Sequence, residues 1–162
     1  MKKFSFFDFV VIFAITVLLT TVATLTYIDY TSNSNKNASI KNHWAVIKFI
    51  KKSLDDCKTG NELILKQNSK INTENLCPLI LSGNAIKMQS AFINHFNELK
   101  LCDTYGLKNT SDNCKKAIVG GITNEKGNVG ETVLSVSGAI LTIHTKITSK
   151  ENITNNIILS MK

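Results

Sequence analysis

The chain has 162 residues, 43% of them hydrophobic, and a formal net charge of +7 at pH 7. This length excludes a large multidomain protein, but it suffices for one compact domain after a membrane segment is set aside. All 19 basic residues are lysine. Since arginine is the usual residue for bidentate phosphate recognition, its absence argues against a dedicated nucleic-acid-binding protein, although the positive charge leaves DNA as a candidate partner.

An uncharged stretch runs from residue 9 to residue 28. At a rise of about 1.5 Å per residue, a helix of this length covers about 30 Å, the hydrocarbon thickness of a bilayer. Lys2 and Lys3 precede the stretch, and a short basic end stays on the cytoplasmic side. We therefore expect a transmembrane helix over residues 4–30 and an extracytoplasmic domain over residues 31–162.

Asp8 is an ionised side chain at the start of this apolar helix. A carboxylate is tolerated at the headgroup level beside Lys2 and Lys3, but it costs on the order of 3 kcal/mol at the bilayer centre. Two interpretations are open on residue type alone. Asp8 either lies at the interface without a role, or it binds a cationic partner within the membrane.

Residues 4–31 resemble the start of type IV pilins and the related pseudopilins. With Phe4 as the first mature residue, Ser5 takes the place of the family's threonine and Asp8 that of its acidic residue. Lys3 stands where the family has glycine before the cleavage site. Three further matches follow without a gap, namely Ala14-Ile15, Val22-Ala23 and Tyr27-Ile28-Asp29-Tyr30-Thr31.

This resemblance implies a short leader, residues 1–3, removed by a prepilin peptidase, with methylation of the new amino group of Phe4. It also implies that Asp8 pairs with the α-amino group of Phe4 on a neighbouring subunit, where a wrong register would leave a buried charge unpaired. An inner-membrane assembly platform and self-association, or association with other pilins, follow from the same resemblance. Because the family's helix-loosening Gly and Pro are Val17 and Leu25 here, we expect a stiffer helix.

A second helical pattern follows a polar patch at residues 31–37. Apolar residues recur at helical spacing, namely Ile40, Trp44, Ile47, Ile50 and Leu54. The polar patch alone has the composition of a linker, whereas the pilin resemblance favours one helix from Ser5 to Cys57, amphipathic over residues 38–57, with a bend at residues 32–37 left open. We expect Trp44 to be an anchor in the core.

Gly60 suits the C-terminal cap of that helix. Residues 62–66 are an apolar run of uncertain type, and residues 71–80 are expected to be a loop. A further helix is expected after a cap at residues 82–84, with one apolar stripe made by Ala85, Met88, Phe92, Phe96 and Leu99.

The C-terminal third has the period of β-strands. Strands are expected at residues 117–123, 132–136, 139–147 and 153–161, separated by polar turn residues. Apolar and polar side chains alternate along the third of these strands, which predicts one buried and one wet face. We expect an α+β fold in which a three- or four-stranded antiparallel sheet packs on the long helix. This is also the lollipop architecture that the pilin resemblance implies.

Four cysteines in an exported domain predict two disulfides. Of the three possible pairings, Cys57 with Cys77 and Cys102 with Cys114 closes the shortest loops. Each bond would stabilise the fold by about 3 kcal/mol. A zinc site is disfavoured, because the sequence has no Cys-x-x-Cys and no histidine at ligand spacing from a cysteine.

Catalytic residues are not apparent in the sequence. The three histidines, His43, His95 and His144, fall on separate elements, and the adjacent Asp55 and Asp56 would diverge on a helix. We expect no catalytic, cofactor or metal site, and predict that the chain is not an enzyme.

Three functions remain. The first is a structural subunit of a type IV pilus-like filament that serves adhesion, motility, DNA uptake or secretion, with a type II secretion pseudopilin as a variant; such a chain moves from the inner membrane to the pilus and cell surface. The second is a membrane-anchored extracytoplasmic binding domain that does not polymerise. The third is a secreted domain that begins near Thr24, because residues 21–23 resemble a signal-peptidase site.

Overall fold

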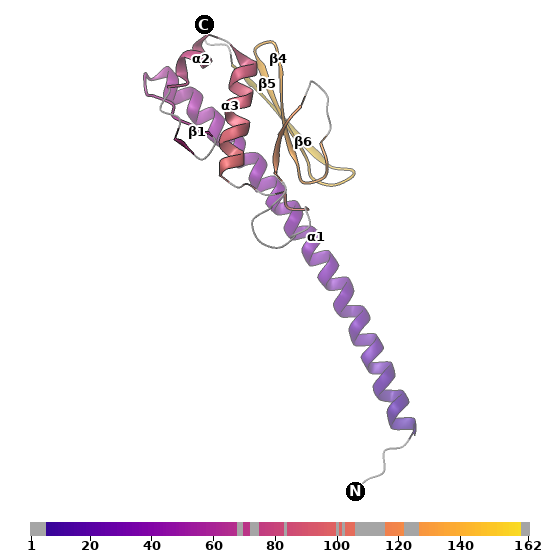
Figure 1. The fold of residues 1–162 in the computed structure, drawn as a ribbon. Helices are drawn as coiled ribbons and strands as arrows, with labels where there is room; N and C mark the ends of the chain where they lie inside the picture. The colour runs from indigo at the N-terminus through magenta and orange to yellow at the C-terminus, as the bar shows by residue number, and fades with distance from the viewer. Residues whose placement is uncertain are drawn as a thin grey trace. The chain divides into compact units, whose positions relative to one another are not determined.

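The computed structural model describes residues 6–67, 70–71, 75–82, 84–99, 101, 103–105, 116–121 and 127–159. The chain divides into two compact units, Met1–Ser34 and Asn35–Lys162. Helix α1 (Phe6–Lys58) supplies the described part of the first unit and the first element of the second (Figure 1). It is helical throughout residues 32–37, where the polar composition alone suggests a linker.

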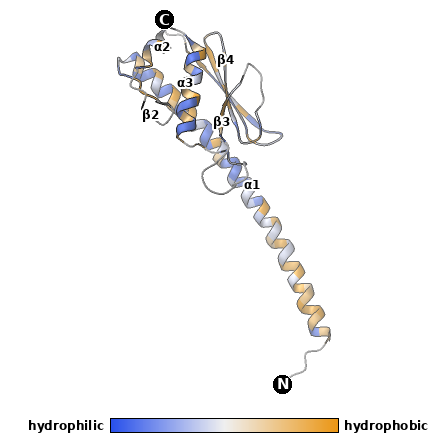
Figure 2. Cartoon of the chain, in the orientation of Figure 1, coloured by the Kyte–Doolittle hydropathy of each residue, from blue (hydrophilic) through white to orange (hydrophobic). Residues whose placement is uncertain are grey.

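Residues 6–34 of α1 form a helix whose apolar side chains are exposed. Phe6, Phe13, Leu18 and Leu25 are each more than 60% accessible, and Figure 2 shows hydrophobic colour along this part of α1. A helix that is apolar all round is stable in water only when it is covered by protein or lipid. This segment is therefore built for an apolar environment.

Residues 35–58 of α1 supply a long buried stripe to the second unit. Val46 and Ile50 are fully buried, and Ile47 and Leu54 are nearly so. The expected core anchor Trp44 is instead 50% exposed, so this prediction was wrong. The reason is that the buried face also contains the polar side chains Ser39, His43 and Ser53, which move its centre round the helix away from Trp44.

Two short elements follow α1. Strands β1 (Lys66–Gln67) and β2 (Lys70–Ile71) pair antiparallel, and helix α2 (Cys77–Leu81) comes next. The expected loop at residues 71–80 was therefore wrong in part. Asn75 precedes α2 and caps its first turn, because its side-chain oxygen accepts a hydrogen bond from the backbone N–H of Cys77 at 3.0 Å.

Helix α3 (Ala85–Glu98) lies where the apolar spacing predicts it. Its N-cap is Asn84, whose Oδ1 accepts from the backbone N–H of Lys87 at 3.2 Å. The buried stripe contains Met88, Phe92 and Phe96, as expected. Leu99, the last member expected in that stripe, is the C-cap residue and is 45% exposed.

Four strands form the main sheet in the order β3-β4-β5-β6. Their bounds are β3 (Ile118–Gly120), β4 (Thr132–Ser137), β5 (Ile140–Lys146) and β6 (Asn152–Ile158). The last three make an antiparallel meander, but β3 pairs with β4 in parallel, so the expectation of a wholly antiparallel sheet was wrong. The segment between β3 and β4 is long enough to return the chain to the same end of the sheet, which a hairpin turn is not.

One face of the sheet is buried against α1 and α3. Leu141 and Ile143 on β5 are fully buried, whereas Thr142 and His144, which alternate with them, are partly exposed, as the alternation predicts. Gln89 of α3 fixes this packing, since its Nε2 donates to the carbonyl of Leu134 at 2.5 Å. The result for the described residues is an α+β unit in which α1 and α3 pack on a four-stranded mixed sheet (Figure 1).

Candidate functional site

The apolar helix of the first unit holds the residue that the sequence singles out for assembly. Asp8 lies in the first turn of α1 and is exposed. Within the described residues, α1 is the one helix long and apolar enough to cross a membrane by length and composition. The predicted processing residues Lys3 and Phe4 lie outside the described residues.

Several threonines lie along the apolar helix, and the hydroxyl of each donates a hydrogen bond to a backbone carbonyl of the same helix. The Oγ1 atoms of Thr16 and Thr26, for example, donate to the carbonyls of Ile12 and Val22 at 2.7 and 2.9 Å. The same bonding holds for four further threonines, namely Thr20, Thr21, Thr24 and Thr31. Because unpaired polar groups are costly in hydrocarbon, this internal bonding makes the segment compatible with lipid despite its hydroxyl content.

A buried polar network joins α1 to three strands of the second unit. His43 is fully buried, with Nδ1 at 2.8 Å from the Thr145 hydroxyl and Nε2 at 2.8 Å from Oδ1 of Asn155. The Thr145 hydroxyl also lies 2.7 Å from that of Thr132. These contacts connect α1 with β4, β5 and β6.

The chemistry of the acceptors fixes the proton positions in this network. Oδ1 of Asn155 can only accept, so Nε2 of His43 carries the proton. Nδ1 of the neutral ring then accepts from Thr145, which in turn accepts from Thr132. Burial lowers the pKa of His43, with the hydrogen bond to Asn155 acting in the opposite direction and the charge of His144 adding to the decrease. The network is therefore complete with a neutral imidazole, the form that burial favours.

A second contact joins α1 to the loops at the same end of the sheet. Lys36 Nζ lies 2.5 Å from a carboxylate oxygen of Glu151, and the hydroxyls of Ser39 and Thr104 are 2.6 Å apart. Burial raises the pKa of the neighbouring Tyr105. Since the lysine and the glutamate are partly exposed, the pair adds little stability and serves mainly to orient α1.

The far end of α1 is held by a covalent bond. Cys57 and Cys77 form a disulfide with a Cα–Cα distance of 5.3 Å, the pairing that the shortest-loop argument favours. It joins the last turn of α1 to the start of α2. The other expected pair, Cys102 and Cys114, lies outside the described residues.

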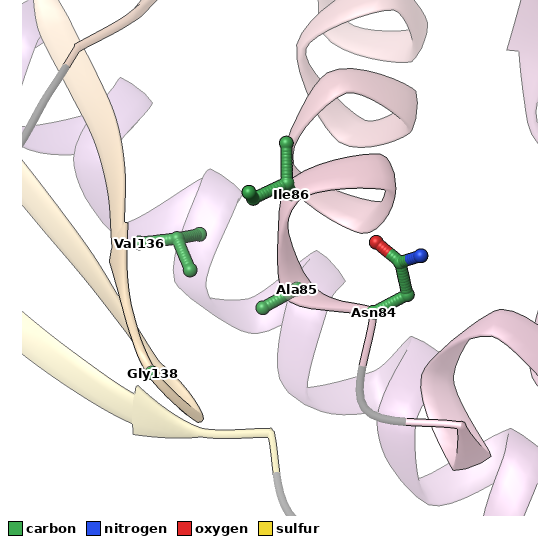
Figure 3. A pocket seen from close by; sticks show the side chains of 5 residues that line it. All are labelled: Asn84, Ala85, Ile86, Val136 and Gly138. Atoms are coloured by element: carbon green, nitrogen blue, oxygen red, sulfur yellow. The ribbon is translucent and has the colours of Figure 1, made fainter.

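A pocket of about 290 Å³ lies between the start of α3 and the β4–β5 turn. Asn84, Ala85, Ile86, Val136 and Gly138 line it, and Val136 points from β4 towards α3 (Figure 3). The Asn84 amide oxygen is engaged in capping α3. The remaining lining is apolar and carries no group suited to catalysis.

The histidines are not brought together. His95 stacks on Phe49 with ring centroids 4.7 Å apart, and Nδ1 of His144 lies 2.7 Å from the Thr154 hydroxyl. Among the residues that the structure describes, no three His, Cys, Asp or Glu side chains form a group that could hold a metal ion.

Comparison of the chain with protein-family models, with curated proteins and with solved structures finds no match. The functional assignment therefore depends on the residues themselves.

Sequence reasoning missed the importance of His43. A histidine in a helix is usually structural or solvent-facing, and its partners Thr145 and Asn155 lie about a hundred residues away. The available signal was the position of His43 four residues before Ile47 and seven before Ile50, which places it on the buried side of α1.

Proposed function

We propose that this chain is a structural subunit of a type IV pilus-like filament. The observation that carries the proposal is the exposed apolar helix at residues 6–34 with an acid, Asp8, in its first described turn. Such a helix needs an apolar environment, which lipid supplies before assembly and neighbouring helices supply afterwards.

The second unit supports this proposal. The same helix α1 continues into an α+β unit, where it packs on a sheet through Val46 and Ile50. A pilin-like lollipop is built in this way, with an assembly helix that is also the spine of the globular domain. The Cys57–Cys77 disulfide agrees with export of this unit beyond the inner membrane.

Asp8 would set the axial register of the filament. After removal of residues 1–3 by a prepilin peptidase, the α-amino group of Phe4 would be a cation at the end of an apolar helix. Pairing of this cation with the Asp8 carboxylate of a neighbouring subunit would be favoured in a low dielectric, and any other register would leave two charges unpaired.

The test compares two acids on the same helix. Asp8→Ala should abolish filaments in the sheared surface fraction, whereas Asp8→Glu should retain them. Asp29→Ala is the matched control, since it removes an exposed acid from the same helix and should leave assembly unchanged. Normal filaments from Asp8→Ala would overturn the proposal.

The N-terminus and intact mass of the native chain give an independent test. A chain that begins at Phe4 with a methylated amine agrees with pilin-like processing, by a peptidase that accepts Lys3. A chain that begins at Met1 would indicate the second candidate, an anchored extracytoplasmic binding domain, and one that begins near Thr24 would indicate a secreted domain.

A further inference from the structure

The exposed side of α1 in the second unit carries a dense positive charge around a single aromatic residue. Lys41, Lys48, Lys51 and Lys52 are all exposed, and Trp44 is 50% exposed. At 100° per residue these five side chains fall within about a quarter to a third of the helix circumference. We refer to them as the lysine–tryptophan face.

The charges of this face are balanced only in part within the described part of the chain, since the exposed Asp55 shares the face and the four lysines outnumber it. The ion pairs found there are Lys36–Glu151 and Lys58–Asp55, so none of the four lysines takes part in one. Lysines three and four residues apart on one helix side repel each other. An anionic partner would remove this repulsion, which gives the face a preference for negative charge.

Trp44 adds an apolar anchor at the centre of the charge. Tryptophan is strongly enriched among the residues that contribute most to protein–protein binding, typically surrounded by polar groups that exclude water. Here the ring of His43 contacts the indole edge-on at a centroid distance of 5.5 Å. A half-exposed indole offers a large apolar surface for contact with a partner.

We propose that the lysine–tryptophan face binds an acidic α-helix of a different protein. A second copy of this chain is disfavoured, because two such faces would place lysines against lysines. Nucleic acid is disfavoured because the chain has no arginine for bidentate phosphate contacts, and because this face has one aromatic where binding single strands typically uses several. A bilayer surface is disfavoured because the apolar side of this helix segment, with Val46 and Ile50, is already buried in the core.

The spacing of the lysines describes the partner. Lys41, Lys48 and Lys52 are separated by seven and four residues, which corresponds to about 10 Å and 6 Å along the helix. A partner helix with carboxylates at the same spacing, and a small side chain opposite Trp44, would match all three. In a filament this partner is an acidic companion subunit; in an anchored, non-polymerising chain it is an acidic receptor helix.

Trp44 is the only tryptophan in the chain, so its emission reports on this face without a label. The full-length chain in non-ionic detergent is titrated with an alanine-rich helical peptide whose glutamates are spaced by seven and four residues. We expect a saturable blue shift, because docking removes water from the indole. A peptide of the same composition with its glutamates spread round the helix should bind about tenfold more weakly.

Matched variants locate the binding. The double substitution Lys41→Gln and Lys48→Gln should weaken binding about tenfold, whereas Lys87→Gln and Lys150→Gln, which remove the same charge from exposed sites elsewhere, should change it less than twofold. Equal effects of the two pairs, or equal binding of the two peptides, would overturn the proposal. So would the absence of any shift.

Two competing ligands complete the test. Single-stranded DNA and the soluble lipid dihexanoylphosphatidylglycerol should leave Trp44 emission unchanged at concentrations where the matched peptide saturates. A shift at lower concentration with DNA would identify a nucleic-acid surface instead, and one with the lipid would identify a membrane-contacting surface.

Discussion

Acidification below about pH 6.5 should destabilise the globular unit through His43. The unfolded histidine has a pKa of about 6.5, whereas burial lowers the pKa in the folded chain. Above pH 6.5 the ring is neutral in both states, so folding is unaffected. As the pH falls through the window between the two pKa values, the unfolded state binds a proton that the folded state does not, and stability is lost.

The magnitude follows from this linkage. Each pH unit within the window lowers the free energy of unfolding by up to about 1.4 kcal/mol for one proton. Between pH 7.5 and pH 5.5 the loss attributable to His43 is therefore at most about 1.4 kcal/mol, which is reached if the folded ring stays neutral throughout. The measurement is urea denaturation of the full-length chain in detergent, followed by Trp44 emission and normalised to the folded and unfolded baselines at each pH.

Two variants isolate the effect of His43 from that of other titrating groups. His43→Gln lacks the titrating ring. Between pH 7.5 and pH 5.5 its free energy of unfolding should therefore fall by up to about 1.4 kcal/mol less than that of the natural chain. Asn155→Asp places a carboxylate next to Nε2, which raises the folded-state pKa of His43 towards or above its unfolded value and should shrink or reverse the loss of stability on acidification. Parallel pH dependences for the natural chain and His43→Gln would refute the reasoning.

Three further predictions concern stability, each measured as the free energy of unfolding. Replacing Cys57 and its disulfide partner by serine should lower it by about 3 kcal/mol relative to the oxidised natural chain in urea titrations, and reduction of the natural chain should cause a similar loss. Gly60→Ala should cost about 1 kcal/mol, because Gly60 has a positive φ but open space around it, and Gly130→Ala should cost several times more. Gly130 also has a positive φ, and a Cβ there would meet a carboxylate and an aromatic ring. Equal losses for the two variants would contradict this. Ile50→Ala should cost about 2–5 kcal/mol because Ile50 is fully buried, and Trp44→Ala should cost less than about 1 kcal/mol because Trp44 is half exposed. Pulse proteolysis measures both, since it does not depend on Trp44 fluorescence. The reverse order would show that Trp44 is a core residue.

Elements with one clear period could be predicted from the sequence. The strands β4 to β6 and helix α3 lie close to their expected positions, because alternation and helical spacing determine which side chains are buried. The short helix α2 was missed because five residues contain too little periodicity, and its start depends on the capping side chain of Asn75.

Pairing direction and buried polar contacts could not be predicted in the same way. Alternation indicates which face of β3 is buried but not whether its neighbour runs parallel to it, since that depends on the route of the chain between β3 and β4. The misplacement of Trp44 has a related cause. The spacing of hydrophobic residues alone does not show that His43 is buried, because its burial depends on hydrogen bonds to threonine and asparagine side chains far away in the sequence.

The disulfide at the end of α1 also matters for mechanical load. A pull on the N-terminal part of α1 would load the contacts that hold this helix in the globular unit, among them Lys36–Glu151, His43 and Ile50. If these contacts gave way, α1 would still be held at Cys57, because displacing side chains does not break the bond to Cys77. The force would then pass into α2 and the remaining core, so that the unit resists extraction of its own spine helix for as long as the cysteines stay oxidised.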